Sequence, residues 1–229
     1  MKTIGLIGGM SWESTVSYYQ AINLGVKRTL GGLHSAKIIM FSVDFAEVEL
    51  LQRAGDWRAA ANLLTQAAKS LEAGGADGFL ICTNTMHKVA ELIAAEVTIP
   101  LLHIADCTAA QLVRDGVAKV GLIGTGFTME QTFYKGRLAE SGLEVVIPNQ
   151  QRRDFIHNVI YQELCLGVID SASKRGYLEA LQELENDGAQ AVILGCTEVA
   201  LLIQQADTHI KLYDTTAIHA NAAVEFMLT

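Results

Sequence analysis

Short apolar runs alternate along the chain with longer segments in which apolar residues recur every three or four positions. The short runs predict buried strands at residues 3–7, 36–43, 78–81, 101–104, 120–124 and 191–195. The longer segments predict helices at residues 13–30, 46–52, 57–73 and 87–95. Fully apolar strands that alternate with helices are typical of a parallel sheet covered on both faces. The pattern therefore predicts an α/β fold.

Two of the apolar runs end in similar polar turns. The run at 78–81 continues into Cys82, Thr83 and Asn84, and the run at 191–195 continues into a Cys-Thr-Glu turn. In open parallel sheets, ligands bind beyond the carboxyl ends of the strands. Because each turn carries a thiol and a hydroxyl, the sequence predicts a site with two reactive faces.

The first half of the chain has a counterpart in the second half. Residues 4–8 recur as 120–124, the turn at 83–85 matches 196–198, and residues 104–109 match 212–217. Three landmarks in the same order indicate an internal duplication. We expect two pseudo-symmetric lobes, each a mostly parallel sheet flanked by helices, with the active site in the cleft between them. The expected N-terminal lobe comprises residues 1–98 plus 208–229, and the C-terminal lobe residues 99–207.

Composition and charge favour a small-molecule ligand. The 229 residues are 50% hydrophobic and carry a net charge of -8, and no basic cluster is longer than Arg152–Arg153. Nucleic acid and anionic membranes attract clustered positive charge, so we expect neither as a partner. No apolar run reaches the roughly 18 residues of a membrane span. Residues 3–7 read as a strand, so we expect no signal peptide.

The four cysteines predict neither a disulfide framework nor a zinc site, because they have no paired C-x-x-C spacing. We therefore expect a cytoplasmic protein. The sequence also has no dinucleotide-binding G-x-G-x-x-G, no phosphate loop, and no His, Cys or carboxylate cluster with metal-ligand spacing. A site without metal or cofactor is the simplest prediction.

Cys196 is the strongest candidate for chemistry. It lies at the end of a buried strand and shortly before a predicted helix, where a helix N-terminus lowers the pKa of a thiol. A buried, inert cysteine is the alternative. Cys82 precedes Thr83 on an extended chain, so its side chain points to the opposite face.

Neutral donors surround both turns. Asn84, Thr85, Thr197 and the backbone N–H groups after each strand suit a bound carboxylate, although each side chain is equally suited to capping a helix. Ser11 and Thr125 allow the same two interpretations. A further residue, His87, lies within a turn of Asn84 and is placed to bond a site residue or to serve the structure alone.

The segments 4–10, 83–87 and 194–198 together resemble the aspartate/glutamate racemase superfamily over essentially the whole chain. Within it, the sequence is most similar to bacterial broad-specificity or L-aspartate/glutamate-specific amino-acid racemases. The resemblance implies two pseudo-symmetric α/β lobes, no pyridoxal phosphate and no metal. It also implies an amino-acid substrate held between the lobes, and a homodimer.

Members of that superfamily usually place one cysteine before each polar turn, and the two thiols exchange the α-proton from opposite faces. Here Thr83 takes the first cysteine's place. Carried over position by position, the resemblance implies Thr83 and Cys196 as the acid/base pair. The implied or candidate substrate-binding residues are Met10, Ser11, Gln52, Asn84, Thr85, Thr125, Thr197 and Glu198.

The sequence thus predicts a cofactor-independent amino-acid racemase. A threonine hydroxyl can donate a proton but is a poor base, because its pKa lies far above the thiol value of about 8.5. Two alternatives stay open. A single cysteine also suits a decarboxylase of malonate-type acids from the same superfamily, and a protein that kept the binding cleft without turnover would be an amino-acid sensor.

Overall fold

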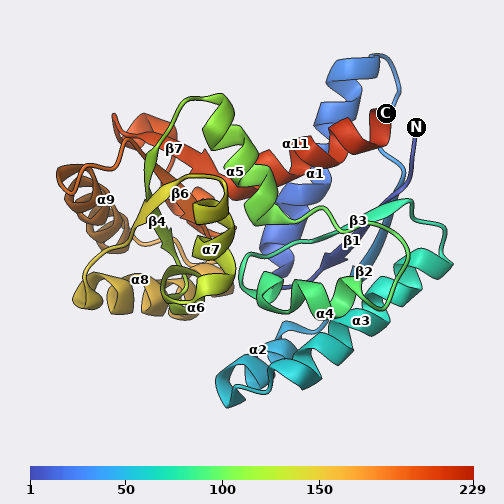
Figure 1. Ribbon diagram of the computed structural model, residues 1–229, viewed down its shortest axis with the longest axis horizontal. Coiled ribbons are helices and arrows are strands. Elements are labelled where there is room, and N and C mark those ends of the chain that lie inside the picture. The colour runs from blue at the N-terminus through green and yellow to red at the C-terminus, as the bar shows by residue number, and fades with distance from the viewer. The chain divides into compact units, whose positions relative to one another are not determined.

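The computed structural model describes all 229 residues and divides into two compact units (Figure 1). The first unit comprises Met1–Ile104 and His219–Thr229, and the second comprises Ala105–Ile218. Each unit is a parallel sheet with helices packed against it. The α/β class predicted from the apolar runs is confirmed. The lobe boundaries expected at residues 98 and 207 fall before the limits of these units, which lie at residues 104 and 218, and the division into lobes stays a prediction.

The sheet of the first unit consists of β1 (Ile4–Gly8), β2 (Ile38–Ser42) and β3 (Gly78–Ile81), in the order β2-β1-β3 and all parallel. The prediction of a further strand at residues 101–104 is wrong, because Leu101 makes only a single parallel bridge to Phe79. The ladder stops there because the N–H of Ile104 donates to the ring of His87, and Ile104 already begins the helix α5 (Ile104–Arg114).

Helices cover both faces of this sheet. On one face, α1 (Trp12–Leu30) and α11 (Thr215–Leu228) pack on Ile4, Leu6 and Leu80. The other face, which carries Ile7, Phe79 and Ile81, is covered by α2 (Phe45–Ala54), α3 (Trp57–Ala73), the 3₁₀ turn η1 (Thr85–Val89) and α4 (Ala90–Ala94). The helix predicted at 87–95 is therefore a 3₁₀ turn followed by a short α-helix.

The sheet of the second unit repeats this plan with one more strand. It has the order β5-β4-β6-β7, and all pairs are parallel. The strands are β4 (Lys119–Gly124), β5 (Glu144–Val146), β6 (Ala191–Gly195) and β7 (Lys211–Asp214). The repeated strands β1 and β4 hold the same position, each between the strand that follows it and a later one.

The helices of the second unit give it a separate core. After α5 come α6 (Gly126–Glu130), α7 (Thr132–Glu140), α8 (Gln150–Gln162), η2 (Leu164–Leu166), α9 (Ser171–Asn186), α10 (Val199–Leu202) and η3 (Gln205–Asp207). Apolar residues of α8, α9 and α10 pack on Ile123, Val192 and Leu194 of β4 and β6. This packing holds β4 and β6 in place within the second unit.

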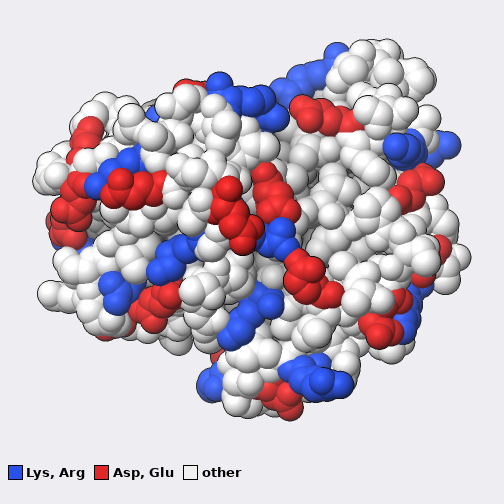
Figure 2. Space-filling view, viewed as in Figure 1, with Lys and Arg blue, Asp and Glu red and all other residues white.

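Charges on the face shown in Figure 2 are mixed, with Lys and Arg side chains interspersed among Asp and Glu. No helix combines the length and the apolar character needed to cross a membrane.

Candidate active site

Two glycines align the ends of β4 and β6. Gly124 pairs with Gly195 in the sheet register. A Cβ on Gly124 would lie 2.7 Å from the carbonyl oxygen of Gly195, and one on Gly195 would lie 2.9 Å from that of Ile123. Real side chains do not tolerate such contacts, so both positions require glycine. Because the paired strands end together, the next residues, Thr125 and Cys196, leave the sheet side by side.

Cys196 is buried, with 7% of its surface exposed. Its thiol donates a hydrogen bond to Oε2 of Glu198 at 3.0 Å, and the hydroxyl of Thr197 donates to the same oxygen at 2.8 Å. The carboxylate therefore ties together all three residues of the Cys-Thr-Glu turn. A thiol that faces a carboxylate has an acceptor to which its proton can pass.

The prediction that a helix N-terminus lowers the pKa of Cys196 is wrong. Burial raises the pKa of this thiol well above its ordinary value, and the negative charge of Glu198 raises it further. The helix that follows, α10, has four residues and begins three positions after the cysteine. So short a helix has too small a dipole to offset the burial and the adjacent charge.

Thr125 forms the N-cap of α6. Its Oγ1 accepts the N–H of Thr128 at 3.3 Å and lies 3.2 Å from the hydroxyl of that residue. The capping role considered from the sequence is confirmed. Contact with a substrate stays a prediction.

In the first unit, the turn after β1 carries Met10 and Ser11, both buried. Gly9 has φ of 90° and its N–H donates to Oγ1 of Thr15 at 2.8 Å. The Met10–Ser11 peptide bond is cis. Ser11 caps α1, with its Oγ accepting the N–H of Ser14 at 3.4 Å. The two predicted residues therefore lie at the carboxyl end of β1.

The adjacent strand β3 ends beside this turn, since Ile7 pairs with Ile81 and the N–H of Cys82 donates to the carbonyl of Ile7 at 2.9 Å. Cys82 lies in the core among residues of α1 and α11, as its place next to Thr83 predicted, and burial raises the pKa of its thiol. Thr83 is only partly buried. The residue that faces out of the sheet is therefore the threonine.

His87 holds the backbone of Thr83. Its Nδ1 lies 2.8 Å from the carbonyl oxygen of Thr83, and its Nε2 accepts the N–H of Ile104 at 3.2 Å. Because a carbonyl only accepts and an N–H only donates, the ring is neutral with its proton on Nδ1. The bond from His87 to the backbone of Thr83 is therefore present, whereas the part of Thr83 in catalysis stays a prediction.

A second buried histidine supports the same region. His219 accepts the Tyr18 hydroxyl at Nδ1 (2.9 Å) and donates from Nε2 to the carbonyl of Leu102 (2.8 Å). Burial lowers its pKa to about 3, with a smaller opposing effect from the Leu102 hydrogen bond. The ring stands 5.8 Å from that of His87. Both histidines are thus held neutral beneath the Thr83 turn.

The remaining predicted residues of the first unit are also buried. Asn84 and Thr85 begin the η1 turn, and Gln52 reaches the next residue, donating from Nε2 to Sδ of Met86 at 3.0 Å. Its neighbour Arg53 points outward and pairs with Glu49 at 2.6 Å. Of these two adjacent residues, only Gln52 lies near the polar turn.

Glu13 was not among the predicted site residues. One of its carboxylate oxygens, Oε2, is buried and has no hydrogen-bond partner. It lies in the first turn of α1, two residues after Ser11. Acidic residues are common in the first turn of any helix, so nothing in the sequence distinguishes this one.

Comparisons with known proteins agree with one another. The sequence profile of the Asp/Glu/hydantoin racemase family matches residues 7–223. The chain is 23% identical to the broad-specificity amino-acid racemase RacX of Bacillus subtilis (strain 168) over 172 residues, which cover 72% of this chain and 71% of RacX.

Two crystal structures are similar over the full length of both chains. A Yersinia pestis protein classed with the Asp/Glu racemases is 53% identical, with a TM-score of 0.93. An aspartate racemase homologue from Pyrococcus horikoshii OT3 is 34% identical, with a TM-score of 0.85. The fold, the matching profile and these likenesses together establish that the chain belongs to the Asp/Glu/hydantoin racemase family.

Proposed function

We propose that the protein is a cofactor-independent amino-acid racemase in which Cys196 and Thr83 exchange the α-proton from opposite faces of the substrate. The observation that carries the proposal is the hydrogen bond from the Cys196 thiol to Glu198 at the end of β6. Membership of a racemase family supports the same reaction.

Glu198 has a specific part in this mechanism. The α-hydrogen of an amino acid is a very weak acid, so its removal needs a base in a water-poor site. A thiol whose pKa is raised is protonated at neutral pH, and Glu198 is the acceptor placed to take its proton. The resulting thiolate then removes the α-proton. Neutral donors stabilise the negative charge that develops on the substrate carboxylate.

Thr83 completes the inversion. Its hydroxyl donates a proton to the opposite face of the planar intermediate, and the hydroxyl regains a proton from solvent. Free enantiomers have equal energy, so kcat/KM is equal in both directions whichever residues act. When the reaction runs the opposite way, Thr83 must remove the α-proton. A hydroxyl is a poor base, so Thr83 makes turnover slow.

The substrate carboxylate is assigned to neutral donors that follow strand ends. These are Ser11, Asn84 and Thr85 in the first unit and Thr125 and Thr197 in the second. Met10, Gln52 and Glu198 complete the proposed lining. The ammonium group needs an acceptor, and the buried, unpartnered Oε2 of Glu13 supplies one next to Ser11.

A homodimer is part of the proposal. The side chains of Trp12, Val16 and Tyr19 follow one another at helical spacing on α1 and are 65%, 43% and 51% exposed. Asn23 continues this stripe and accepts the N–H of Ala36, just before β2. The stripe therefore lies on the β2 side of the helix, and β2 is an edge strand that exposes Met40 and Phe41. Such a surface suits a second copy of the chain.

We also assign the protein to the cytoplasm, since all four cysteines are free thiols, which suits a reducing compartment.

A chiral assay of the common L- and D-amino acids tests the function. The proposal expects at least one amino acid to be racemised by the wild type and not by Cys196→Ala. The single cysteine also suits a decarboxylase of malonate-type acids, so the same preparations are assayed for CO₂ release from a disubstituted malonate. Tight amino-acid binding without turnover would instead identify a sensor, and either of these results would contradict the racemase.

A further inference from the structure

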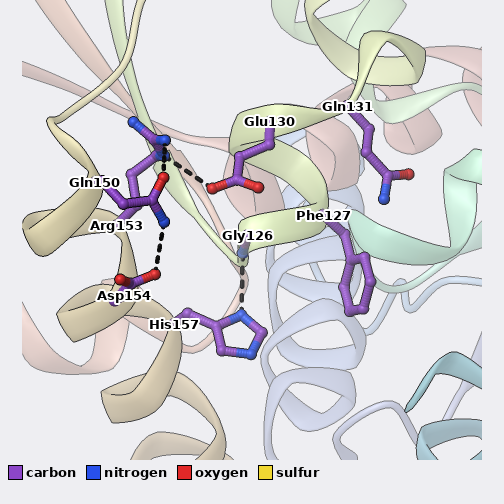
Figure 3. A pocket seen from close by; sticks show the side chains of 8 residues that line it. All are labelled: Gly126, Phe127, Glu130, Gln131, Gln150, Arg153, Asp154 and His157. Carbon is purple, nitrogen blue, oxygen red and sulfur yellow. Dashed lines mark hydrogen bonds and ion pairs between the residues drawn. The ribbon is translucent and has the colours of Figure 1, made fainter. Parts of the chain in front are cut away.

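A pocket of about 270 Å³ lies between α6 and α8 of the second unit (Figure 3). Gly126, Phe127 and Glu130 of α6 form one wall, and Arg153 and His157 of α8 form the other. None of these residues belongs to the proposed acid/base pair or to the carboxylate donors. Gly126, however, directly follows Thr125.

The ring of His157 faces the backbone of Gly126 (Figure 3). The N–H of Gly126 donates to Nδ1 of His157 at 3.1 Å. Gly126 is the first residue of α6, where backbone N–H groups have no acceptor within the helix. Because a backbone N–H only donates, Nδ1 carries no proton and the ring is neutral, with its proton on Nε2.

This hydrogen bond and the cap of Thr125 hold the same turn from two sides. Thr125 Oγ1 accepts the N–H of Thr128, while His157 accepts the N–H of Gly126. A proton added to Nδ1 would set two donors against each other, and the bond to Gly126 would be lost. Protonation of His157 would therefore remove one of the two hydrogen bonds that hold the turn between β4 and α6.

Several groups control that protonation. His157 is half-buried, with the ring of Tyr161 at 4.9 Å and that of Phe127 at 6.2 Å. Burial lowers the pKa of His157, and the negative charges of Glu130 on α6 and Asp154 on α8 partly oppose it. Arg153 pairs with Glu130 at 2.9 Å and so weakens its influence.

We propose that His157 is a positioning residue: its neutral ring holds the Thr125–Gly126 turn in the conformation that binds the substrate carboxylate and releases the turn when it takes up a proton. The role in binding rests on the proposed racemase function. The role in the turn stands on the geometry of the second unit alone.

The two roles are tested separately. Nuclear magnetic resonance of ¹⁵N-labelled protein follows the Gly126 amide and the ring nitrogens of His157 between pH 8 and pH 5. We expect the Gly126 amide to titrate together with the ring in the wild type and to stay constant in His157→Asn, whose Oδ1 takes the place of Nδ1 but does not titrate. A Gly126 amide that ignores the titration of His157 would overturn the proposal.

Kinetics test the effect on binding. We expect KM of the wild type to rise as the pH falls below 6.5, whereas KM of His157→Asn stays flat with kcat little changed. His157→Phe keeps a ring but removes the acceptor, and should raise KM about fivefold to tenfold at every pH, the worth of about one hydrogen bond. Equal pH profiles of KM in the wild type and His157→Asn would overturn the proposal.

Asp154→Asn provides a matched control, because it predicts the direction in which the pH profile should shift. Removing this charge should move the acid limb of the KM profile to lower pH, since the aspartate favours the charged ring. A shift to higher pH would contradict the assignment. If the wild type racemises no amino acid, the proposed function fails, and the ¹⁵N titration alone decides the inference about the turn.

Discussion

The thiol of Cys196 and the carboxylate of Glu198 form a 3.0 Å hydrogen bond at the end of β6, two residues apart in one turn. The carboxylate keeps the thiol protonated, because its negative charge disfavours a thiolate beside it. In the proposed mechanism, the same carboxylate is the acceptor that takes the proton of the thiol. Substitution of Glu198 should therefore change the pKa of the Cys196 thiol and the racemase activity in different ways.

Glu198→Gln should lower kcat/KM by about 100-fold, the usual contribution of a proton acceptor. It should also lower the pKa of the Cys196 thiol, because a neutral amide no longer opposes the thiolate. The measurements are kcat/KM and the pH dependence of alkylation by iodoacetamide. Glu179→Gln, an exposed carboxylate of the same unit, is the control. Undiminished activity in Glu198→Gln would rule out its role as acceptor.

Cys82→Ala should leave racemisation nearly intact, since this thiol lies in the core rather than on the polar turn. The small cavity should lower the free energy of unfolding by about 1–2 kcal/mol, seen as a lower Tm. Loss of activity with an unchanged Tm would show that the catalytic position had been misplaced by one residue.

Thr83→Val removes the hydroxyl while keeping the shape of the side chain. We expect racemisation to slow by about 100-fold, while Cys196 still exchanges the α-proton of one enantiomer. Chiral chromatography and proton exchange are measured on the same samples. Unchanged racemisation in Thr83→Val would exclude the hydroxyl as a proton donor.

Stability should depend on pH through His219. Its pKa in the folded protein, about 3, lies below the ordinary 6.5, so protonation favours the unfolded chain. The stabilisation is therefore complete above pH 6.5 and is lost as the pH falls toward 3, by at most about 5 kcal/mol. His219→Gln keeps a donor for Leu102 without titrating. Urea unfolding should show a flatter pH profile for this variant, and an equal slope would contradict the assignment.

Introducing negative charges on α1 tests the proposed dimer surface. Val16→Glu combined with Tyr19→Glu should convert a dimer into a monomer in light scattering after gel filtration, because two buried carboxylates would have no partners. Leu24→Glu, at an exposed position of α1 outside this stripe, should leave the dimer intact. A wild-type protein that is monomeric at all concentrations would contradict the proposed dimer.

Much of the fold followed from the apolar runs, because buried parallel strands must be apolar on both faces. The limits of β3 and α3 match their predicted ranges. The prediction of a strand at 101–104 was wrong because the ring of His87 accepts the N–H of Ile104. No local sequence pattern indicates that contact.

The site was less predictable for the same reason. Alternation of side chains correctly placed Cys82 in the core, whereas the pairing of Thr83 with Cys196 as acid and base stays a prediction. The raised pKa of Cys196 depends on burial and on the orientation of Glu198, which a sequence does not specify. The bond from Gly126 to His157 joins residues 31 positions apart and required the packing of α6 on α8.

Proton NMR in D₂O tests the central claim most directly, by following loss of the α-proton signal of each enantiomer of an amino acid that the wild type racemises. The account predicts that Cys196 exchanges the α-proton of one enantiomer with solvent faster than inversion is completed, and that Cys196→Ala abolishes both exchange and inversion. Equal exchange rates for both enantiomers, each matching racemisation, would contradict the unequal roles of Cys196 and Thr83. Exchange that persists in Cys196→Ala would contradict the thiol as the base.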